Sequence, residues 1–390
     1  MAKRYPAQTQ LKDIEQGLTG LFARVVAESK FEGIFATHPA VARMTGEAKH
    51  SGLLSQTMPV VSVACDHLAD ATSLPLVNEV YQYKLRDANK ADHNNYVLVA
   101  SEKTAQKFIS GGYPPEVVKV VNCRYELNPY EKEVVEKKQR DLERISQSGE
   151  LSDESPPILS LIQDNFETVP ERLIAENLIK SYALELADRR LMFTFLMTEA
   201  DENRVRKQIK DKSIPDHCFE IIETVENLEE FLTHPQNHRG SIFFVRKYPD
   251  WKGIVDLDKH VQFTDMQMLL ELYSHVVFSR PSEVPRDAAN FGTPSFLVFP
   301  YGPVEVSIGE QAIKDGFSLP WATVDRCRSS EFHRRMKGLP RLDLADPHTY
   351  RKLLEMSRTA LQSPMRQPLT GIVESIVEII QAQEQKLSRE

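Results

Sequence analysis

The chain has 390 residues, of which 41% are hydrophobic and 27% are charged, an ordinary composition for a globular protein with at least one large core. At roughly 150 residues per domain, this length predicts two or three domains. Lys and Arg total 48 against 56 Asp and Glu, so the formal net charge is −8, which argues against a general nucleic-acid binder because such proteins usually carry a basic surface. The longest apolar runs, such as 191–197, are far shorter than the roughly 20 residues of a membrane span.

The cysteines and histidines predict no metal or redox site. None of the four cysteines belongs to a C-x-x-C pair, and no H-x-x-H or H-E-x-x-H motif occurs. Cys65 and Cys123 fall in apolar, strand-like runs, where buried and reduced thiols are expected. Reduced thiols, together with the lack of an apolar signal segment in the first ten residues, fit a cytoplasmic protein. If the protein meets a membrane, we expect it to lie on the surface.

The N-terminal 129 residues predict a parallel α/β domain. Near-continuous, β-branched apolar runs such as 59–67 are typical of central strands that are buried on both faces. Helical periodicity separates these runs, and strand–helix alternation at this spacing indicates βαβ units. The predicted strands are 33–37, 59–67, 95–101 and 117–123, and the predicted helices are 11–29, 40–50 and 102–112.

A charge-dense segment interrupts this alternation at residues 130–156. Its first part, EKEVVEKKQRDLERISQ, reads as a helix with few apolar positions, and SGELSDESPP is an acidic, turn-rich stretch. We interpret the segment as an interdomain connection followed by a linker. The plainer alternative is a solvated helix and loop with no further role.

The alternation resumes in residues 157–344, which predict a second parallel α/β domain, and two helices at 345–362 and 369–387 form a C-terminal segment, 345–390. The fold class predicted is therefore α/β, with two doubly wound, Rossmann-like parallel-sheet domains facing a cleft. The predicted strands of the second domain are 157–163, 191–197, 219–224, 241–246, 260–265, 276–280 and 295–300. The predicted helices of this domain are 171–189, 199–212, 227–234, 266–275 and 286–292.

Two long stretches of the chain resemble one family of transferases. The segments THPAVARMTGEAKHSGL, MPVVSVACDH and DANKADHNNYVLVASEKTAQKFISGGYPPEVVKVVN resemble the N-terminal domain of monogalactosyldiacylglycerol-synthase-like glycosyltransferases. The segment VQFTDMQMLLELYSHVVFSRPSEVPRDAANFGTPSFLVFPYGPVEVSIGEQAIKDG resembles the donor half of the same superfamily, glycosyltransferase family 28-like, which includes the peptidoglycan N-acetylglucosaminyltransferase. The resemblance covers residues 33–124 and 258–316, and it implies a two-domain GT-B fold.

The resemblance assigns donor-binding roles to residues of the second domain. It makes Asp287 the nearest counterpart of the carboxylate that accepts the ribose hydroxyls, with Glu283 as rival. It places backbone groups at Phe263 and Met266 beside the edge of the base. The guanidinium of Arg280 would offset diphosphate charge. The last assigned donor contact, to the sugar, is Gln311.

The acceptor side of the resemblance falls in the first domain. His38 and Asp66 follow predicted strands, at the edge where ligands of parallel sheets bind. A base is needed there to take the proton of an attacking hydroxyl, and His or Asp suits that task. His67 is a second candidate.

The chain departs from the family at its glycine-rich loops. It opens with a predicted helix and has no glycine-rich loop before Phe31, and QDNFETVPE stands where the second loop is expected. The segment RPSEVPRD carries two prolines and no glycine, which makes close backbone approach to a diphosphate harder.

The resemblance implies a glycosyltransferase that takes a nucleotide-sugar donor, with UDP as the expected nucleotide, and a lipid or glycan acceptor. It implies inversion at the anomeric carbon, with no metal and no cofactor beyond the donor itself. A nucleotide-sugar 2-epimerase that uses Asp66, His67 and Glu102 is one alternative, and a non-catalytic binding or scaffold protein is another. In the last helix, a broad apolar stripe favours core packing over a membrane surface or a partner. Its residues are Ile372, Val373, Ile376, Val377, Ile379 and Ile380.

Overall fold

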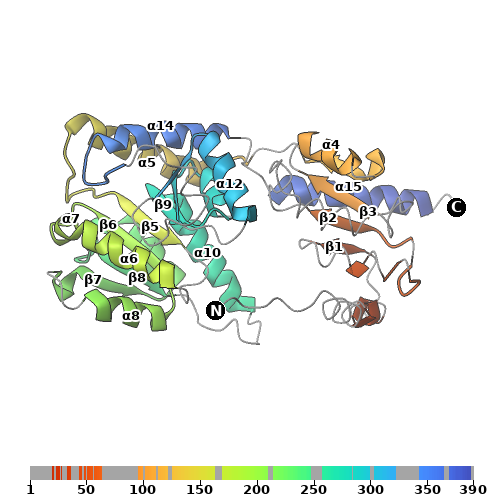
Figure 1. The fold of residues 1–390 in the computed structure, drawn as a ribbon, viewed down its shortest axis with the longest axis horizontal. Helices are drawn as coiled ribbons and strands as arrows, with labels where there is room; N and C mark the ends of the chain where they lie inside the picture. Colours follow the sequence, from red (N-terminus) through yellow and green to blue (C-terminus); the bar gives the residue numbers. More distant parts are fainter. Residues whose placement is uncertain are drawn as a thin grey trace. The chain divides into compact units, whose positions relative to one another are not determined.

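A computed structural model shows two compact units, residues 1–125 with 367–390 and residues 126–366 (Figure 1). The structure describes residues 20–21, 23–26, 28, 33–36, 44–45, 48–49, 51–55, 57–63, 95–99, 102–110, 113–121, 125–162, 169–209, 214–246, 257–282, 284–298, 303–321, 342–363 and 369–387. Each unit is built on a parallel sheet, so the predicted fold class, α/β on parallel sheets, is confirmed.

The second unit holds a seven-stranded parallel sheet in the order β11-β10-β9-β5-β6-β8-β7. Its strands are β5 (Ile158–Ile162), β6 (Met192–Met197), β7 (Phe219–Ile222), β8 (Ile242–Arg246), β9 (Val276–Ser279), β10 (Ser295–Leu297) and β11 (Ser318–Pro320). Its helices are α5 (Pro129–Ser148), α6 (Val169–Ser181), α7 (Ala183–Ala187), α8 (Glu199–Ile209), α9 (Val225–Thr233), α10 (Leu257–Tyr273), α11 (Val284–Asn290), α12 (Pro303–Lys314) and α14 (Thr349–Gln362). Short 3-10 turns occupy Asp216–Cys218 and Pro235–Asn237.

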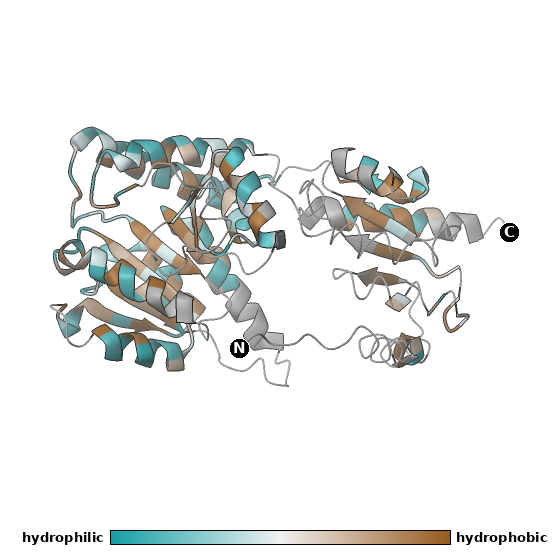
Figure 2. Cartoon of the chain, in the orientation of Figure 1, coloured by the Kyte–Doolittle hydropathy of each residue, from teal (hydrophilic) through white to brown (hydrophobic). Residues whose placement is uncertain are grey.

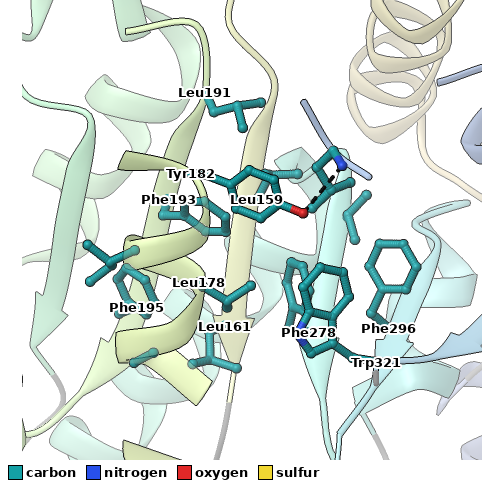
Figure 3. Packing of buried hydrophobic residues seen from close by; sticks show 14 of the residues in the cluster. Leu159, Leu161, Leu178, Tyr182, Leu191, Phe193, Phe195, Phe278, Phe296 and Trp321 are labelled. Atoms are coloured by element: carbon teal, nitrogen blue, oxygen red, sulfur yellow. Dashed lines mark hydrogen bonds between the residues drawn. The ribbon is translucent and has the colours of Figure 1, made fainter. Parts of the chain in front are cut away.

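The central strands of this sheet are apolar because helices cover both of their faces. Every residue of β5 and β6 is buried, as the near-continuous apolar runs predicted. On one face, Figure 3 shows Phe193 and Leu159 beside Tyr182 of the helical layer. At the end of that cluster the Trp321 ring lies 4.9 Å from Phe278, centroid to centroid. The hydropathy colouring in Figure 2 follows this layering, with apolar strands and mixed outer helices.

Helix α5 belongs to the second unit, which corrects its interpretation as an interdomain connection. A capping box starts it: the Glu131 N–H donates to Asn128 Oδ1 at 2.9 Å, and the Asn128 N–H donates to Glu131 Oε2 at 2.8 Å. Gly149, with φ of 70°, ends it in the left-handed conformation that suits glycine. Its buried stripe, which includes Leu142 and Ile145, packs into the main core with α14. The predicted segment 130–156 is therefore an integral part of this unit.

Further elements differ from the structure, and the sequence analysis predicts neither α12 nor β11. The C-terminal segment 345–390 is divided, since α14 packs on α5 in the second unit and α15 (Leu369–Leu387) belongs to the first. The strand predicted over 260–265 is wrong, because α10 runs without a break through residues 257–273. The alternation of Val261 and Phe263 with polar residues misleads, because alternation over so short a stretch is also the pattern of a strand.

The first unit holds a four-stranded parallel sheet in the chain order β1-β2-β3-β4. Its strands are β1 (Ile34–Ala36), β2 (Val60–Val63), β3 (Asn95–Val99) and β4 (Val118–Val120), with helix α4 (Glu102–Ser110), a 3-10 turn at Pro115–Val117, and α15. Helix α4 packs Ala105 against Val97 and Val99, and α15 packs Ile379 against Leu98 on the other side. Ile379 confirms core packing for part of the C-terminal stripe, while Val373, Val377 and Ile380 remain exposed.

The buried Lys138 joins α5 to residues at the ends of α10 and α11. Lys138 Nζ donates to Leu272 O at 2.8 Å, to Phe291 O at 3.1 Å and to Thr293 Oγ1. The Thr293 hydroxyl donates its own proton to Glu271 O, so all three oxygens face the amine as acceptors. Burial lowers the pKa of Lys138 to about 7. The amine therefore links the C-terminal ends of α10 and α11 to α5.

Replacing this amine should destabilise the second unit. We expect Lys138→Met to lower the free energy of unfolding by about 3 kcal/mol, because the variant leaves buried carbonyl groups without their donor. Urea unfolding measures the change. Lys137→Met, at the exposed neighbouring position on α5, serves as the matched control and should shift the free energy by less than about 0.5 kcal/mol. Equal effects of the two variants would contradict this role.

His275 makes a second link to α5, at the start of β9. Its Nδ1 accepts the Ile158 N–H at 3.0 Å, so the ring is held as the neutral tautomer with the proton on Nε2. Nε2 lies 3.9 Å from Asp141 Oδ2 on α5. Burial lowers the pKa of His275, with Lys138 acting in the same direction and Asp141 opposing it. Burial acts to raise the pKa of Asp141, but His275, Arg144 and Lys137 bring it below its ordinary value.

The lowered pKa of His275 predicts that the free energy of unfolding decreases as the pH is lowered. Between the ordinary histidine pKa of about 6.5 and the lower folded value, the unfolded chain binds more protons, so stability falls as pH falls through that window. We expect His275→Asn, which keeps an acceptor for Ile158 and does not titrate, to flatten the stability profile below about pH 6.5. Urea unfolding at several pH values measures the slope. The exposed His348→Asn should leave the slope unchanged, and an unchanged slope in His275→Asn would refute the assignment.

Candidate functional site

The large sheet has a topological switch point between β5 and β9. From β5 the chain adds β6 on one side, then the outer strand β7, and then β8 between β6 and β7. It then returns past β5 to add β9, β10 and β11 on the other side. The connections that leave β5 and β9 therefore diverge at the carboxyl edge of the sheet, and in open parallel sheets this is where ligands bind. In the first unit the four described strands follow chain order, so they contain no such point.

On the β8 side of this edge, the charges neutralise one another. Arg246 ends β8, and its Nε donates to Glu202 Oε2 at 2.7 Å, while Nη1 bonds Glu223 and Nη2 lies 3.7 Å from Glu199. Glu202 is 2% exposed on its side chain and also accepts from Arg206 Nε at 2.8 Å. The hydrogen bond that Arg246 donates to Glu202 raises the pKa of Arg246. Arg246 therefore braces α8 against the sheet, and its guanidinium is occupied.

Arg280 lies at the switch point itself, directly after β9. Its Nη1 donates to Glu305 Oε1 in the first turn of α12, at 3.3 Å, near the long end of the hydrogen-bond range. The two side chains are 14% and 18% exposed. The backbone beyond Arg280 offers few donors: Pro281 and Pro285 have no N–H, and the Ser282 N–H donates to Arg280 O at 2.8 Å.

Asp287 lies on α11, one helix after Arg280. Its Oδ1 accepts from Arg286 Nε at 3.1 Å, and about a third of its side chain, 34%, is exposed. Burial raises the pKa of the Asp287 carboxyl, and the charge and hydrogen bond of Arg286 oppose that shift. A carboxylate held in this way can accept hydrogen bonds from a pair of hydroxyls, as the predicted ribose contact requires.

Gln311 lies well inside α12 and does not join Arg280. Its Nε2 donates to Asp315 Oδ1 at 2.7 Å, four positions on along the same helix. At 1.5 Å per residue, Gln311 lies roughly 12 Å along the axis from the first residue of α12. The structure brings Glu305 to Arg280, a contact that the sequence analysis does not predict. Its only signal was its place just after a proline at a strand-to-helix junction, a common position for an acidic first-turn residue.

Phe263 and Met266 lie on α10, which removes the reason for assigning them to the base. Backbone groups inside a helix bond one another and offer no free edge for a nucleobase. Met266 is 1% exposed, so its side chain is part of the core. We therefore place no base contact at either residue.

Two buried polar groups at the same edge lack partners among the described residues. Ser279 Oγ, at the last position of β9, and Trp321 Nε1, directly after β11, make no hydrogen bond to any residue that the structure describes. Ser279 is fully buried and Trp321 is 8% exposed. Unsatisfied buried groups are uncommon in folded proteins and accompany sites that water or a ligand completes.

The remaining predicted site residues, His38, Asp66, His67 and Glu283, lie outside the described residues, and their roles stay predictions. Within the described ranges, no group of three or more His, Cys, Asp or Glu side chains is arranged to hold a metal ion. No helix in the described part of the chain is long and apolar enough to span a bilayer.

Comparisons with known proteins give structural similarity alone. No protein-family model matches the sequence, and no curated protein matches it either. Among solved structures, the UDP-GlcNAc 2-epimerase from Neisseria meningitidis bound to UDP-GlcNAc is similar at 13% identity and a TM-score of 0.44, over 96% of this chain and 84% of that one. The UDP-GlcNAc 2-epimerase from Methanocaldococcus jannaschii is similar at 10% identity and a TM-score of 0.45, over 94% and 82% of the two chains. A glycotransferase of kitacinnamycin is similar at 10% identity and a TM-score of 0.45, over 98% and 85%. Similarity at this level identifies neither an activity nor a ligand.

The two arginines of the carboxyl edge should differ in their effect on stability. We expect Arg246→Gln to lower the free energy of unfolding by about 2 kcal/mol, because it leaves the buried Glu202 with fewer donors. Arg280→Gln should cost less, about 1 kcal/mol, because Glu305 is less deeply buried than Glu202 and its charge is also stabilised by the first turn of α12. Urea unfolding of both variants checks the contrast. A cost for Arg280→Gln as large as that for Arg246→Gln would make Arg280 a structural residue.

Proposed function

We propose that this chain binds a nucleotide-sugar at the carboxyl edge of its large sheet and transfers the sugar to a hydroxyl acceptor without a metal ion. The observation that carries the proposal is the position of Arg280 at the topological switch point. A guanidinium at that point suits a diphosphate, because its planar donors match the geometry of phosphate oxygens. The resemblance of residues 258–316 to donor halves of glycosyltransferases supports a nucleotide as the ligand.

The proposed step is a displacement at the anomeric carbon. The acceptor oxygen forms a bond to that carbon, the bond to the diphosphate oxygen breaks, and the nucleoside diphosphate leaves with the electron pair. Arg280 stabilises the charge that develops on the leaving diphosphate. Asp287 accepts the ribose hydroxyls and fixes the donor's position. The proton of the acceptor goes to a base, for which the candidates from the sequence are His38, Asp66 and His67.

Ligand binding tests the proposal before any acceptor is known. We expect UDP or one of its sugar conjugates to raise the melting temperature equally with magnesium and with EDTA, because a ligand at 100 times its dissociation constant adds about 2.7 kcal/mol of stability. This corresponds to a few degrees for a unit of this size. Arg280→Gln and Asp287→Asn should abolish the shift. Arg351→Gln, which removes an exposed arginine of α14, is the control and should keep it.

The outcomes separate this proposal from its alternatives. A shift that survives Arg280→Gln would move the site away from the switch point. Release of UDP from a UDP-sugar only when an acceptor is present supports transfer, whereas isomerisation of the sugar without an acceptor supports a 2-epimerase. A well-folded sample that binds no nucleotide would refute the proposal in favour of a non-catalytic binding or scaffold protein.

A further inference from the structure

Trp321 and Arg280 lie at the same level of the carboxyl edge of the large sheet. The last paired row across β9, β10 and β11 consists of Ser279, Leu297 and Pro320. Arg280 and Trp321 each follow that row by one residue, and the pairing continues there, since the Trp321 N–H donates to Leu297 O at 2.8 Å. One strand separates the two residues, so their backbones lie about 10 Å apart. A diphosphate joined to a nucleoside and a sugar is long enough to contact both.

The side chain of Trp321 reaches across β10 towards β9. Its ring centroid lies 5.3 Å from that of Phe296 on β10 and 4.9 Å from that of Phe278 on β9 (Figure 3). Phe278 precedes Arg280 by two positions, so the indole lies against the strand that leads to the switch point. Only 8% of Trp321 is exposed, and close packing against two rings holds the indole in a defined orientation.

The indole N–H of Trp321 is a buried donor. Its Nε1 makes no hydrogen bond to any residue that the structure describes. An indole nitrogen can only donate, and the ring fixes its direction, whereas a hydroxyl such as that of Ser279 can rotate to suit a neighbour. A buried donor without an acceptor destabilises the unliganded chain, and an acceptor that reaches it restores that loss. Because Nε1 is buried, a ligand must displace the groups that cover it, and the new hydrogen bond offsets part of that cost.

We propose that Trp321 is a further binding residue of this site, whose indole N–H donates to an oxygen of the nucleotide's diphosphate. This inference rests on the proposed function and adds a neutral donor to the charge of Arg280. A group that can only donate suits an ionised phosphate oxygen, which only accepts. The level that Trp321 shares with Arg280 gives the diphosphate a second contact at the same edge of the sheet.

NMR observes this indole N–H directly. The chain has two tryptophans, Trp251 and Trp321, so the wild-type spectrum has two indole signals, which Trp251→Phe assigns. We expect saturating UDP in EDTA to move the Trp321 signal to higher proton frequency, as a newly formed hydrogen bond does. Uridine at the same concentration has no phosphate and should leave the signal in place.

Titration calorimetry tests the same contact by substitution. Trp321→Phe keeps an aromatic ring and removes the N–H. We expect it to bind UDP about tenfold more weakly, which is the effect of one hydrogen bond to a charged acceptor. Phe296→Leu is the matched control, because it reduces the volume of the same aromatic cluster and removes no donor, and it should leave the affinity for UDP nearly unchanged. A melting curve for each variant confirms that it is folded.

The outcomes separate this contact from the proposed function. If UDP binds the wild-type chain and the Trp321 signal does not move, the contact is wrong and the proposed function survives. Movement of the signal by uridine as large as that by UDP overturns the contact to the diphosphate. Equal losses of affinity in Trp321→Phe and Phe296→Leu show an effect of packing alone and overturn it as well. If UDP does not bind, both proposals fail. If Trp321→Phe does not fold, the signal of the wild-type chain decides.

Discussion

Burial of the seven-stranded sheet on both faces is the constraint on which the rest of the second unit depends. Strands such as β5 and β6 have no solvent face, so helices must cover both sides and the chain must cross from edge to edge between strands. Because all strands are parallel, their carboxyl ends lie at one edge of the sheet. The chain returns past β5 to add β9 on its other side, so the connections that follow these two neighbouring strands lead away from each other. The position for a ligand is therefore a consequence of strand order, and side chains such as Arg280 only give that position its chemistry.

Two arginines at this edge, Arg246 and Arg280, have different surroundings. Arg246 contacts Glu202, Glu223 and Glu199, and Glu202 is also tied to Arg206, so any movement would leave buried charge without a partner. Arg280 lies 3.3 Å from Glu305 at the switch point, and Glu305 is less deeply buried than Glu202. The two arginines thus lie at the same edge of the sheet, and only Arg280 lies at the point where ligands of such sheets bind.

The sequence predicts the strands well and the helices less evenly. Apolar β-branched runs identified the core strands, because burial on both faces leaves a signal at every position. The strand predicted over 260–265 is wrong because Val261 and Phe263 alternate with polar residues, as in a strand, although they lie in the continuous helix α10. For helix α5, the many charged residues led to the prediction of an interdomain connection, although the helix has a buried stripe that includes Leu142, Ile145 and Lys138. In the site, Arg280 could be found from its place after a strand, whereas Glu305 could not, because its partner is set by tertiary folding.

The stretch of residues 280–287 contains no glycine, which limits how its backbone could contact a diphosphate. Glycine-rich turns let backbone N–H groups approach a phosphate closely, and this chain has Pro281 and Pro285 in the corresponding stretch, where neither residue has an N–H. The Ser282 N–H is already bonded to Arg280 O. Among the described residues that directly follow β9, Arg280 is therefore the donor that we propose for the diphosphate.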